Sequence, residues 1–205
     1  MVQIKIIIKF VVDYLDMPRV KLFDEKEALL KATDLFWEKG YANTSLSDLI
    51  KTLGISKGSF YDTFNSKREI FDRSMKHYQQ LNIGYLQQLL ESEPNVQQGI
   101  RTLFLRLINV AFDDSLKRGC LMANTCSELA GSDDAIRTFL QEHNAMMFDL
   151  IKKYLKSGGL KSTTDIDALS NLILTQLTGM NVELKFRVTK EEVMNASELI
   201  VGLIQ

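Results

Sequence analysis

The sequence is short of several residue types, and each shortage excludes a class of protein. Only two prolines and eleven glycines occur among 205 residues, which leaves room for long uninterrupted helices. The two cysteines, Cys120 and Cys126, cannot make a disulfide scaffold, so we expect a reduced, cytoplasmic setting. No apolar run reaches the roughly 18 residues of a membrane span, so we expect no membrane partner.

Neither the net charge nor the histidines point to a particular ligand. The formal net charge of −1 gives no overall attraction to nucleic acid, so any basic surface must be local. His77 and His143 are the only histidines, and neither stands in a metal-ligand or catalytic-triad spacing. We therefore expect no metal, no cofactor and no enzymatic activity. With 45% hydrophobic and 25% charged residues, the composition is that of an ordinary globular protein.

The first sixteen residues differ from the rest of the chain. The segment VQIKIIIKFVVDYL is apolar and β-branched, and it lacks the small-residue cleavage site of a signal peptide. The ordinary composition begins at Met17. We predict that residues 1–16 are a non-native or disordered extension and that Met17 is the working start.

Beyond that extension, apolar residues recur at helical spacing and predict an all-α chain of about nine helices. The apolar stripe in EKEALLKATDLFWEKG ends at Gly40, and a short helix, LSDLIKTL, ends at Gly54. Ser66 and Glu69 form a predicted capping box that starts a long helix, and Thr189 caps the last one.

The two short helices around Gly54 predict a helix-turn-helix. Neither is long enough to be stable alone, and a short glycine-containing turn joins them. If Phe60 and Phe64 pack the second helix against the first, Lys57 and Tyr61 remain at the surface. The second helix of such a motif enters the DNA major groove by its N-terminal residues, where a lysine can reach guanine acceptors and a tyrosine hydroxyl a phosphate.

The same residues carry a family resemblance. The stretch FDEKEALLKATDLFWEKGYANTSLSDLIKTLGISKGSFYDTFNSKREIF, residues 23–71, resembles the N-terminal domain of TetR/AcrR-type transcriptional regulators without a gap. The resemblance implies a DNA-binding domain over residues 17–66 and a ligand-binding and dimerisation domain over residues 67–205. By resemblance, six residues occupy DNA-contacting positions: Thr44, Lys57, Gly58, Ser59, Tyr61 and Lys67.

The expected function is a transcriptional repressor that binds double-stranded DNA at a palindromic operator. A symmetric homodimer would place two recognition helices roughly 34–36 Å apart, one helical turn of DNA. A small apolar or electrophilic effector would release it. Asp62 departs from the histidine or asparagine common at its position. It either accepts a hydrogen bond from a cytosine amino group, pairs with a base such as Lys57, or faces away from DNA.

The larger C-terminal part predicts a ligand pocket and a dimer interface. Methionines and aromatic residues suit an adaptable small-molecule site, and the predicted pocket residues are Phe104, Ile108, Met122, Met147 and Phe148. The last two helices carry more apolar surface than a single hairpin needs, which favours a four-helix interface between two copies. The predicted interface residues are Leu169, Ile173, Leu177, Leu199, Ile200 and Leu203.

The stretch RGCLMANTCSELA, residues 118–130, carries a G-C-L-x-x-N element. It resembles the electrophile-responsive, NemR-like sub-group of the same family, which implies that Cys120 is a possible redox or electrophile sensor. Arg118 and a helix N-terminus would favour its thiolate form. The alternative is that Cys120 is a small buried hydrophobe.

Two other function classes are compatible with the sequence. A helical ligand-binding dimer without DNA binding is the stronger rival, and a gel-shift assay would exclude or support it. A thiol-dependent enzyme built from Cys120, His143 and Glu128 is the weaker one, because nothing in their spacing supports it.

Overall fold

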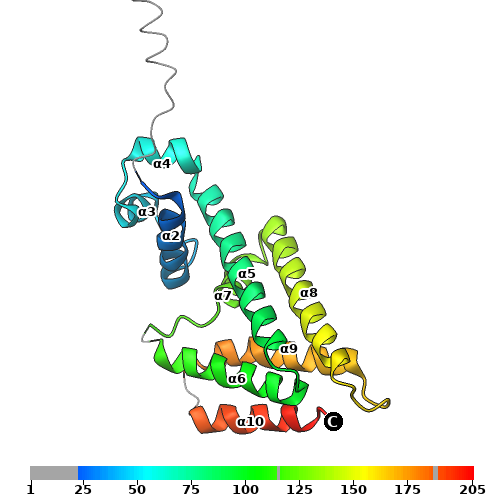
Figure 1. Cartoon of the computed structure of the whole chain (residues 1–205). Coiled ribbons are helices and arrows are strands. Elements are labelled where there is room, and N and C mark those ends of the chain that lie inside the picture. The colour runs from blue at the N-terminus through cyan, green and yellow to red at the C-terminus, as the bar shows by residue number, and fades with distance from the viewer. Residues whose placement is uncertain (1–22, 115, 187–188) are drawn as a thin grey trace, which may run out of the picture.

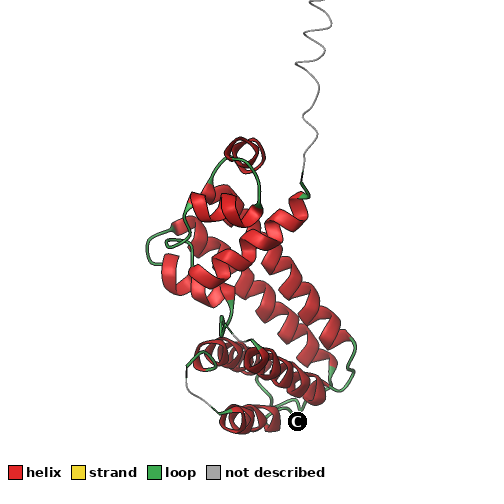
Figure 2. Cartoon of the chain, turned by 90° about the vertical axis from the view of Figure 1, so that its left-hand side faces the viewer, coloured by secondary structure: helices red, strands yellow, loops and turns green. Residues whose placement is uncertain are grey.

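The computed structural model describes residues 23–114, 116–186 and 189–205, and these residues form nine α-helices and no strand (Figures 1 and 2). The predicted all-α fold is confirmed. The predicted extension over residues 1–16 lies outside the described residues. The helices are α2 (Glu25–Lys39), α3 (Leu46–Leu53), α4 (Lys57–Phe64), α5 (Lys67–Glu91), α6 (Val96–Asp113), α7 (Leu121–Leu129), α8 (Asp134–Ser157), α9 (Ile166–Glu183) and α10 (Lys190–Gly202).

A bilayer span needs a helix that is both long and apolar throughout. None of the helices in the described ranges is long and apolar enough to cross a membrane.

The helix starts follow the capping signals of the sequence, with one difference. Thr189 and Glu192 form the predicted reciprocal capping box at the start of α10. The box predicted at the start of α5 is only half formed. Ser66 accepts the Glu69 backbone N–H at 3.0 Å, whereas the Glu69 carboxylate accepts from the Asn65 side chain at 2.8 Å. Asn65 ends α4 with a positive φ, and its amide competes for that carboxylate.

The first hydrophobic core joins the short helices α2, α3 and α4 to the N-terminal half of α5. It is rich in aromatic rings, and Phe36, Phe60, Phe64 and Phe71 are all almost fully buried. Three residues from later in the chain complete this core: Leu121, Met122 and Ile136. Residues of α7 and of the start of α8 therefore belong to the same core as α2, α3 and α4.

The second core lies at the other end of α5, among α6, α8, α9 and α10 (Figure 1). Leu86, Leu89 and Leu90 bring the C-terminal part of α5 into it. A single 25-residue helix thus contributes to both cores. The predicted boundary between residues 66 and 67 does not separate two independently packed cores.

Several predicted functional residues belong to this second core instead. Phe104 and Ile108 are 1% and 0% exposed and pack among core residues, so their predicted place in a ligand pocket is wrong. Four of the six predicted interface residues are also buried within the protomer, with at most 8% exposure: Leu169, Ile173, Leu177 and Ile200. These four residues lie on the inner faces of α9 and α10, where they pack within the protomer, whereas Leu199 and Leu203 are exposed.

A close approach between α6 and α8 sets the geometry of the second core. The Tyr154 hydroxyl donates to the carbonyl oxygens of Glu93 and Asn95, at 2.5 and 3.1 Å. A Cβ atom at Gly99 would lie 1.9 Å from that hydroxyl oxygen. Only glycine fits at residue 99 while Tyr154 keeps these two hydrogen bonds.

We predict that Gly99→Ala lowers the free energy of unfolding by about 2 kcal/mol, because the ring must move and strain the packing around it. Urea unfolding followed by circular dichroism measures the change. Gly84→Ala is the matched control, since open space surrounds residue 84 on α5. There alanine should stabilise the helix by up to about 1 kcal/mol. Equal effects of the two substitutions would contradict the prediction.

Candidate functional site

The second helix of the helix-turn-helix, α4, presents an exposed face at one end of the molecule (Figure 1). Phe60 and Phe64 are fully buried, as predicted, and Tyr61, whose ring contacts the edge of the Phe60 ring, is 42% exposed. Lys57 and Gly58 are exposed in the first turn, where the backbone N–H groups give a helix its positive end. The Ser59 hydroxyl is half-buried and lies 2.9 Å from the hydroxyl of the capping Ser56.

The side chain of Thr44, which the family resemblance places among the DNA-contacting positions, does not lie on this exposed face. It is 0% exposed, and its hydroxyl donates to the Gly40 carbonyl oxygen at 2.7 Å. The neighbouring Ser45 caps α3 in its place and forms a reciprocal box with Asp48. Hydrogen bonds from the Ser45 backbone and side chain and from Lys39 lower the pKa of Asp48 to about 2, so this box stays ionised at neutral pH.

Lys67, at the start of α5, lies beside the α2–α3 turn. Its ammonium is 4.3 Å from the centre of the Tyr41 ring, and that ring packs against Phe71 at 4.7 Å between centroids. Within the part of the chain that the structure describes, neither Lys67 nor Lys57 lies within ion-pair distance of a carboxylate. Both charges are therefore available to an anionic partner.

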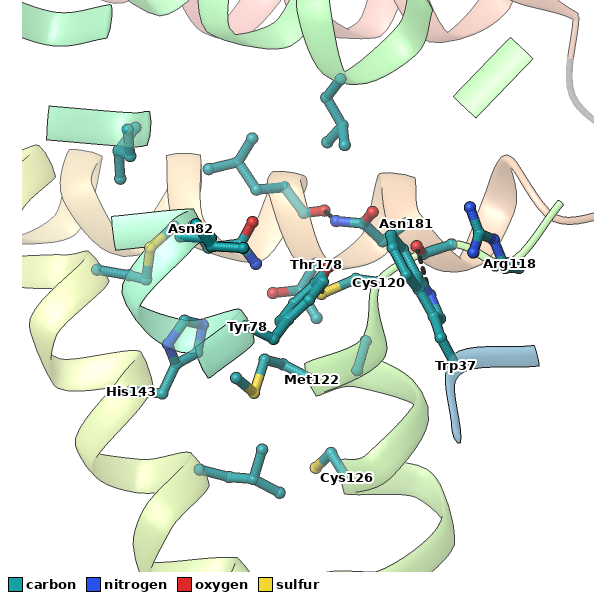
Figure 3. A pocket seen from close by; sticks show the side chains of 18 of the residues that line it. Trp37, Tyr78, Asn82, Arg118, Cys120, Met122, Cys126, His143, Thr178 and Asn181 are labelled. Carbon is teal, nitrogen blue, oxygen red and sulfur yellow. Dashed lines mark hydrogen bonds between the residues drawn. The ribbon is translucent and has the colours of Figure 1, made fainter. Parts of the chain in front are cut away.

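A chamber of about 770 Å³ lies between the two cores (Figure 3). This volume is within the range of small-molecule sites. Helices α2, α5, α6, α7, α8 and α9 all contribute to its walls, so α2 of the N-terminal domain supplies one of them. Its apolar lining includes Leu30, Trp37, Leu81, Leu86, Leu103, Leu107, Met122, Met147, Leu174 and Leu177.

Three polar side chains face one another on one side of the chamber: Tyr78, Asn82 and His143 (Figure 3). Burial, together with the nearby Cys120 thiol, raises the pKa of the Tyr78 hydroxyl well above its usual range, so it remains a neutral hydrogen-bond donor. Burial also lowers the pKa of His143 below its usual 6.5. The imidazole is therefore mainly neutral at pH 7, and its Nδ1 has no hydrogen-bond partner among the described residues.

Both cysteines line the chamber as free thiols (Figure 3). Cys120 is the N-cap residue of α7, and the Tyr78 hydroxyl lies 3.9 Å from its sulfur. Arg118, which the sequence places two residues before this thiol, has other partners in the structure. Its guanidinium lies 4.3 Å from the Trp37 ring centre and pairs with Asp34 at 3.1 Å and Asp114 at 3.4 Å.

The predicted pocket residues have mixed outcomes. Met122 and Met147 line the chamber, whereas Phe148 packs at the edge of the second core with Lys152 5.5 Å above its ring. Sequence reasoning missed the contribution of α2. Trp37 is the chain's only tryptophan, and its indole N–H donates to the Gly119 carbonyl oxygen at 3.1 Å. An apolar stripe on α2 is compatible with a core as well as with a pocket, so the sequence contains no signal that separates them.

Helix α7 connects the chamber to the turn between α2 and α3. Its first turn lines the chamber, and near its other end the Glu128 carboxylate accepts the backbone N–H groups of Tyr41 and Ala42, at 2.9 and 2.6 Å. Gly40 precedes them with φ of 80°, and a Cβ atom there would lie 2.8 Å from Glu128 Oε2. The turn thus requires glycine both for its backbone conformation and for the approach of Glu128.

The contacts of Glu128 also bear on the enzyme alternative. Its carboxylate is bound to the backbone of the α2–α3 turn, while His143 is on the far wall of the chamber from α7 (Figure 3). The structure does not bring Cys120, His143 and Glu128 together as a nucleophile, base and orienting acid.

The outer faces of α9 and α10 are exposed and apolar at intervals of three and four residues. On α9 the exposed positions include Ala168, Leu172, Thr175, Gly179 and Val182. On α10, Ala196 is exposed, and the predicted interface residues Leu199 and Leu203 are 77% and 56% exposed. An alternation of three and four residues is the pattern of a helix–helix seam.

Two family descriptions match this chain. Residues 28–73 match bacterial regulatory proteins of the tetR family, and residues 97–200 match the tetracyclin repressor-like C-terminal domain. The first match covers the helix-turn-helix and the second covers most of α6 to α10.

Several known proteins are similar to this chain over most of their own length. The uncharacterized HTH-type transcriptional regulator YezE of Bacillus subtilis is 30% identical over 162 residues, which is 77% of this chain and 84% of YezE. The HTH-type transcriptional repressor ComR of Escherichia coli is 26% identical over 181 residues, 86% of each chain. Among solved structures, a cysteine mutant of the TetR family regulator CifR in complex with 26-base-pair operator DNA is 27% identical. It superimposes with a TM-score of 0.77 over 90% of this chain and 98% of that one.

We predict that Glu128→Gln loosens the α2–α3 turn. Glutamine replaces one carboxylate oxygen with an NH₂ donor, so one of the two backbone N–H groups loses its acceptor and the other keeps only a neutral one. The expected cost is about 1 kcal/mol, which is about 5-fold faster amide exchange at Tyr41 and Ala42. Hydrogen exchange followed by NMR measures it. Glu142→Gln, on the exposed surface of α8, should leave both amides unchanged, and unchanged exchange in Glu128→Gln would contradict the role of this carboxylate.

Proposed function

The chain belongs to the tetR family of bacterial regulatory proteins, and from that premise we propose that it is a repressor released from a palindromic operator by an effector. It is a DNA-binding transcriptional regulator. The observation that carries the proposal is the combination of an exposed recognition helix, with Lys57 in its first turn, and a chamber whose wall includes α2 of the same N-terminal domain.

The proposed DNA surface consists of Lys57, Gly58, Ser59, Tyr61 and Lys67. Lys57 and Gly58 lie in the exposed first turn of α4, so the lysine can reach base edges while glycine permits a close backbone approach. The exposed Tyr61 hydroxyl and the Lys67 ammonium are suited to phosphates on either side. Ser45 and Ser66 add two capped helix N-termini, whose partial positive charge also favours phosphate.

We propose that two copies assemble through the outer faces of α9 and α10. The small residues Ala168, Thr175 and Gly179 would allow two α9 helices to approach closely. Leu199 and Leu203, the two predicted interface residues that are exposed, would pack against the partner. A four-helix arrangement of this kind buries apolar surface that is exposed in the single chain, and its two-fold axis matches a palindromic operator.

The proposed coupling between effector and DNA runs through α7. Cys120 at its N-terminus lines the chamber, and Glu128 near its C-terminus binds the turn that leads into α3. A ligand that displaces α7 changes the position of this turn relative to α5, and so the separation of the two recognition helices in a dimer. Such coupling requires the ligand to bind the DNA-incompetent state more tightly, typically by about 1–3 kcal/mol.

A finer proposal is that Cys120 is the electrophile-responsive residue that the G-C-L-x-x-N resemblance implies. It is half-buried in the chamber wall, its side chain makes no capping hydrogen bond, and α7 begins directly after it. Addition of this sulfur to an activated carbon–carbon double bond would form a thioether at the chamber end of α7 and place the adduct against Tyr78.

We predict that Lys67→Ala weakens binding to every DNA sequence and makes the slope of log Kobs against log salt less negative by about 0.9 for each phosphate that is no longer neutralised. Gel shift or fluorescence anisotropy with the promoter beside the protein's own gene measures affinity over a salt series. Lys156→Ala removes an exposed lysine from the far end of α8 and should change neither quantity. A wild-type slope in Lys67→Ala would refute the phosphate contact, and absence of any DNA binding by the wild type would refute the proposed function.

We predict that N-ethylmaleimide at neutral pH releases the wild-type protein from its operator through Cys120. Mass spectrometry identifies the alkylated residue, and anisotropy follows the release. Cys126→Ser, which removes the other chamber thiol, should respond as the wild type does, whereas Cys120→Ser should stay bound. If N-ethylmaleimide also releases the Cys120→Ser variant from the operator, Cys126 is the responsive residue instead. If Cys120 is alkylated and the protein stays bound to the operator, the effector is a reversible ligand.

A further inference from the structure

We propose that the chamber takes an amphipathic monoanion, with an elongated apolar body inside and a carboxylate bound by Arg106 at the mouth. This inference rests on the proposed function, because it names the chemical class of the effector.

The inner part of the chamber is suited to an apolar group. Leu86, Leu103, Leu174 and Leu177 line it and are each at most 8% exposed. The polar side chains nearest to them already have partners on their own helix. Thr178 donates to the Leu174 carbonyl oxygen at 3.0 Å, and Asn181 donates to the Leu177 carbonyl oxygen at 2.7 Å.

Among the described residues, no cation at the inner end of the chamber is available to bind an anion. Burial keeps His143 neutral at pH 7 by lowering its pKa, and a charged group beside it would lose its hydration without a counter-charge. The positive charge of Arg118 is already paired with Asp34 and Asp114. An acidic group of the ligand therefore has no favourable place at the inner end.

Arg106 differs from the other two arginines of the chamber lining. Arg118 has its two carboxylates, and Arg137 pairs with Asp134 at 2.8 Å. Arg106 Nη1 donates to the Tyr85 hydroxyl oxygen at 2.9 Å, and no carboxylate of the described residues lies within ion-pair distance. A guanidinium offers two parallel N–H groups that match a carboxylate. Within the described ranges, Arg106 is thus the uncompensated arginine of the chamber, and it lies on the exposed part of α6.

The mouth around Arg106 is apolar although it faces solvent. Leu30, Leu81, Tyr85 and Val110 line the chamber and are between 46% and 63% exposed. They come from α2, α5 and α6, so helices of both the first and the second core contribute to this rim. Exposed apolar side chains grouped around an opening are typical of a binding surface. An alkyl or aryl chain that passes through the mouth would cover them while its acidic end meets Arg106.

The native fluorescence of Trp37 provides the test, because this only tryptophan of the chain lines the chamber. The full-length protein is titrated below micellar concentration with dodecanoate, dodecanol and dodecyltrimethylammonium, which share one chain and differ in charge. We expect dodecanoate to bind about 10-fold more tightly than dodecanol, as one charge-assisted pair implies, and the ammonium compound to bind most weakly.

Arg106→Gln should abolish the preference for dodecanoate and leave dodecanol binding unchanged. Arg101→Gln is the matched control on the same helix, because Arg101 pairs with Glu198 and does not line the chamber; it should keep the wild-type preference. Equal affinity of the wild type for dodecanoate and dodecanol, or a preference that persists in Arg106→Gln, overturns the proposal.

Operator binding is measured on the same preparations, so that the two proposals fail separately. A protein that binds its operator without preferring the carboxylate keeps the proposed function and loses this ligand class. A protein that prefers the carboxylate but binds no operator keeps the ligand class and loses the repressor function.

Discussion

The structure depends on one helix being buried at both ends and left partly uncovered in the middle. Ile70, Phe71 and Met75 place the start of α5 in the first core, and Leu86, Leu89 and Leu90 place its end in the second. Between them, Leu81 and Tyr85 are about half exposed beside the chamber. A ligand in the chamber would complete the packing of this middle segment. Since α5 is continuous, any change in how its middle packs must be accommodated at one core or the other.

Local signals in the sequence predicted the helices well, because capping and helix termination depend on neighbouring residues. Gly40 and Gly54 end helices as expected, and the Thr189 box is present. Thr44 shows the limit of such reasoning. A Thr-Ser pair before a helix offers two hydroxyls, and only the structure shows that Ser45 caps α3 while Thr44 bonds backward to Gly40. The resemblance includes Thr44 among the DNA-contacting positions, and it carries no information about the burial of that side chain.

The ligand chamber and the interface faces could not be predicted residue by residue. Helices α9 and α10 are apolar on two sides, so periodicity alone cannot assign Leu169 to the core and Leu199 to the surface. The chamber exists where helices distant in sequence fail to fill the space between them. Trp37 and Thr178 belong to its wall because of how α2 and α9 are placed, and no local pattern encodes that placement.

The contribution of α2 to the chamber has a consequence for engineering. In a regulator with this architecture, a chimera can be made by joining the DNA-binding helices of one protein to the ligand-binding helices of another. Here a junction before α5 would replace the wall that contains Leu30 and Trp37, and with it the hydrogen bond to Gly119. It would also replace the turn that Glu128 binds. A functional hybrid therefore needs a compatible α2 surface and a glycine at position 40, and ligand preference is a property of both halves together.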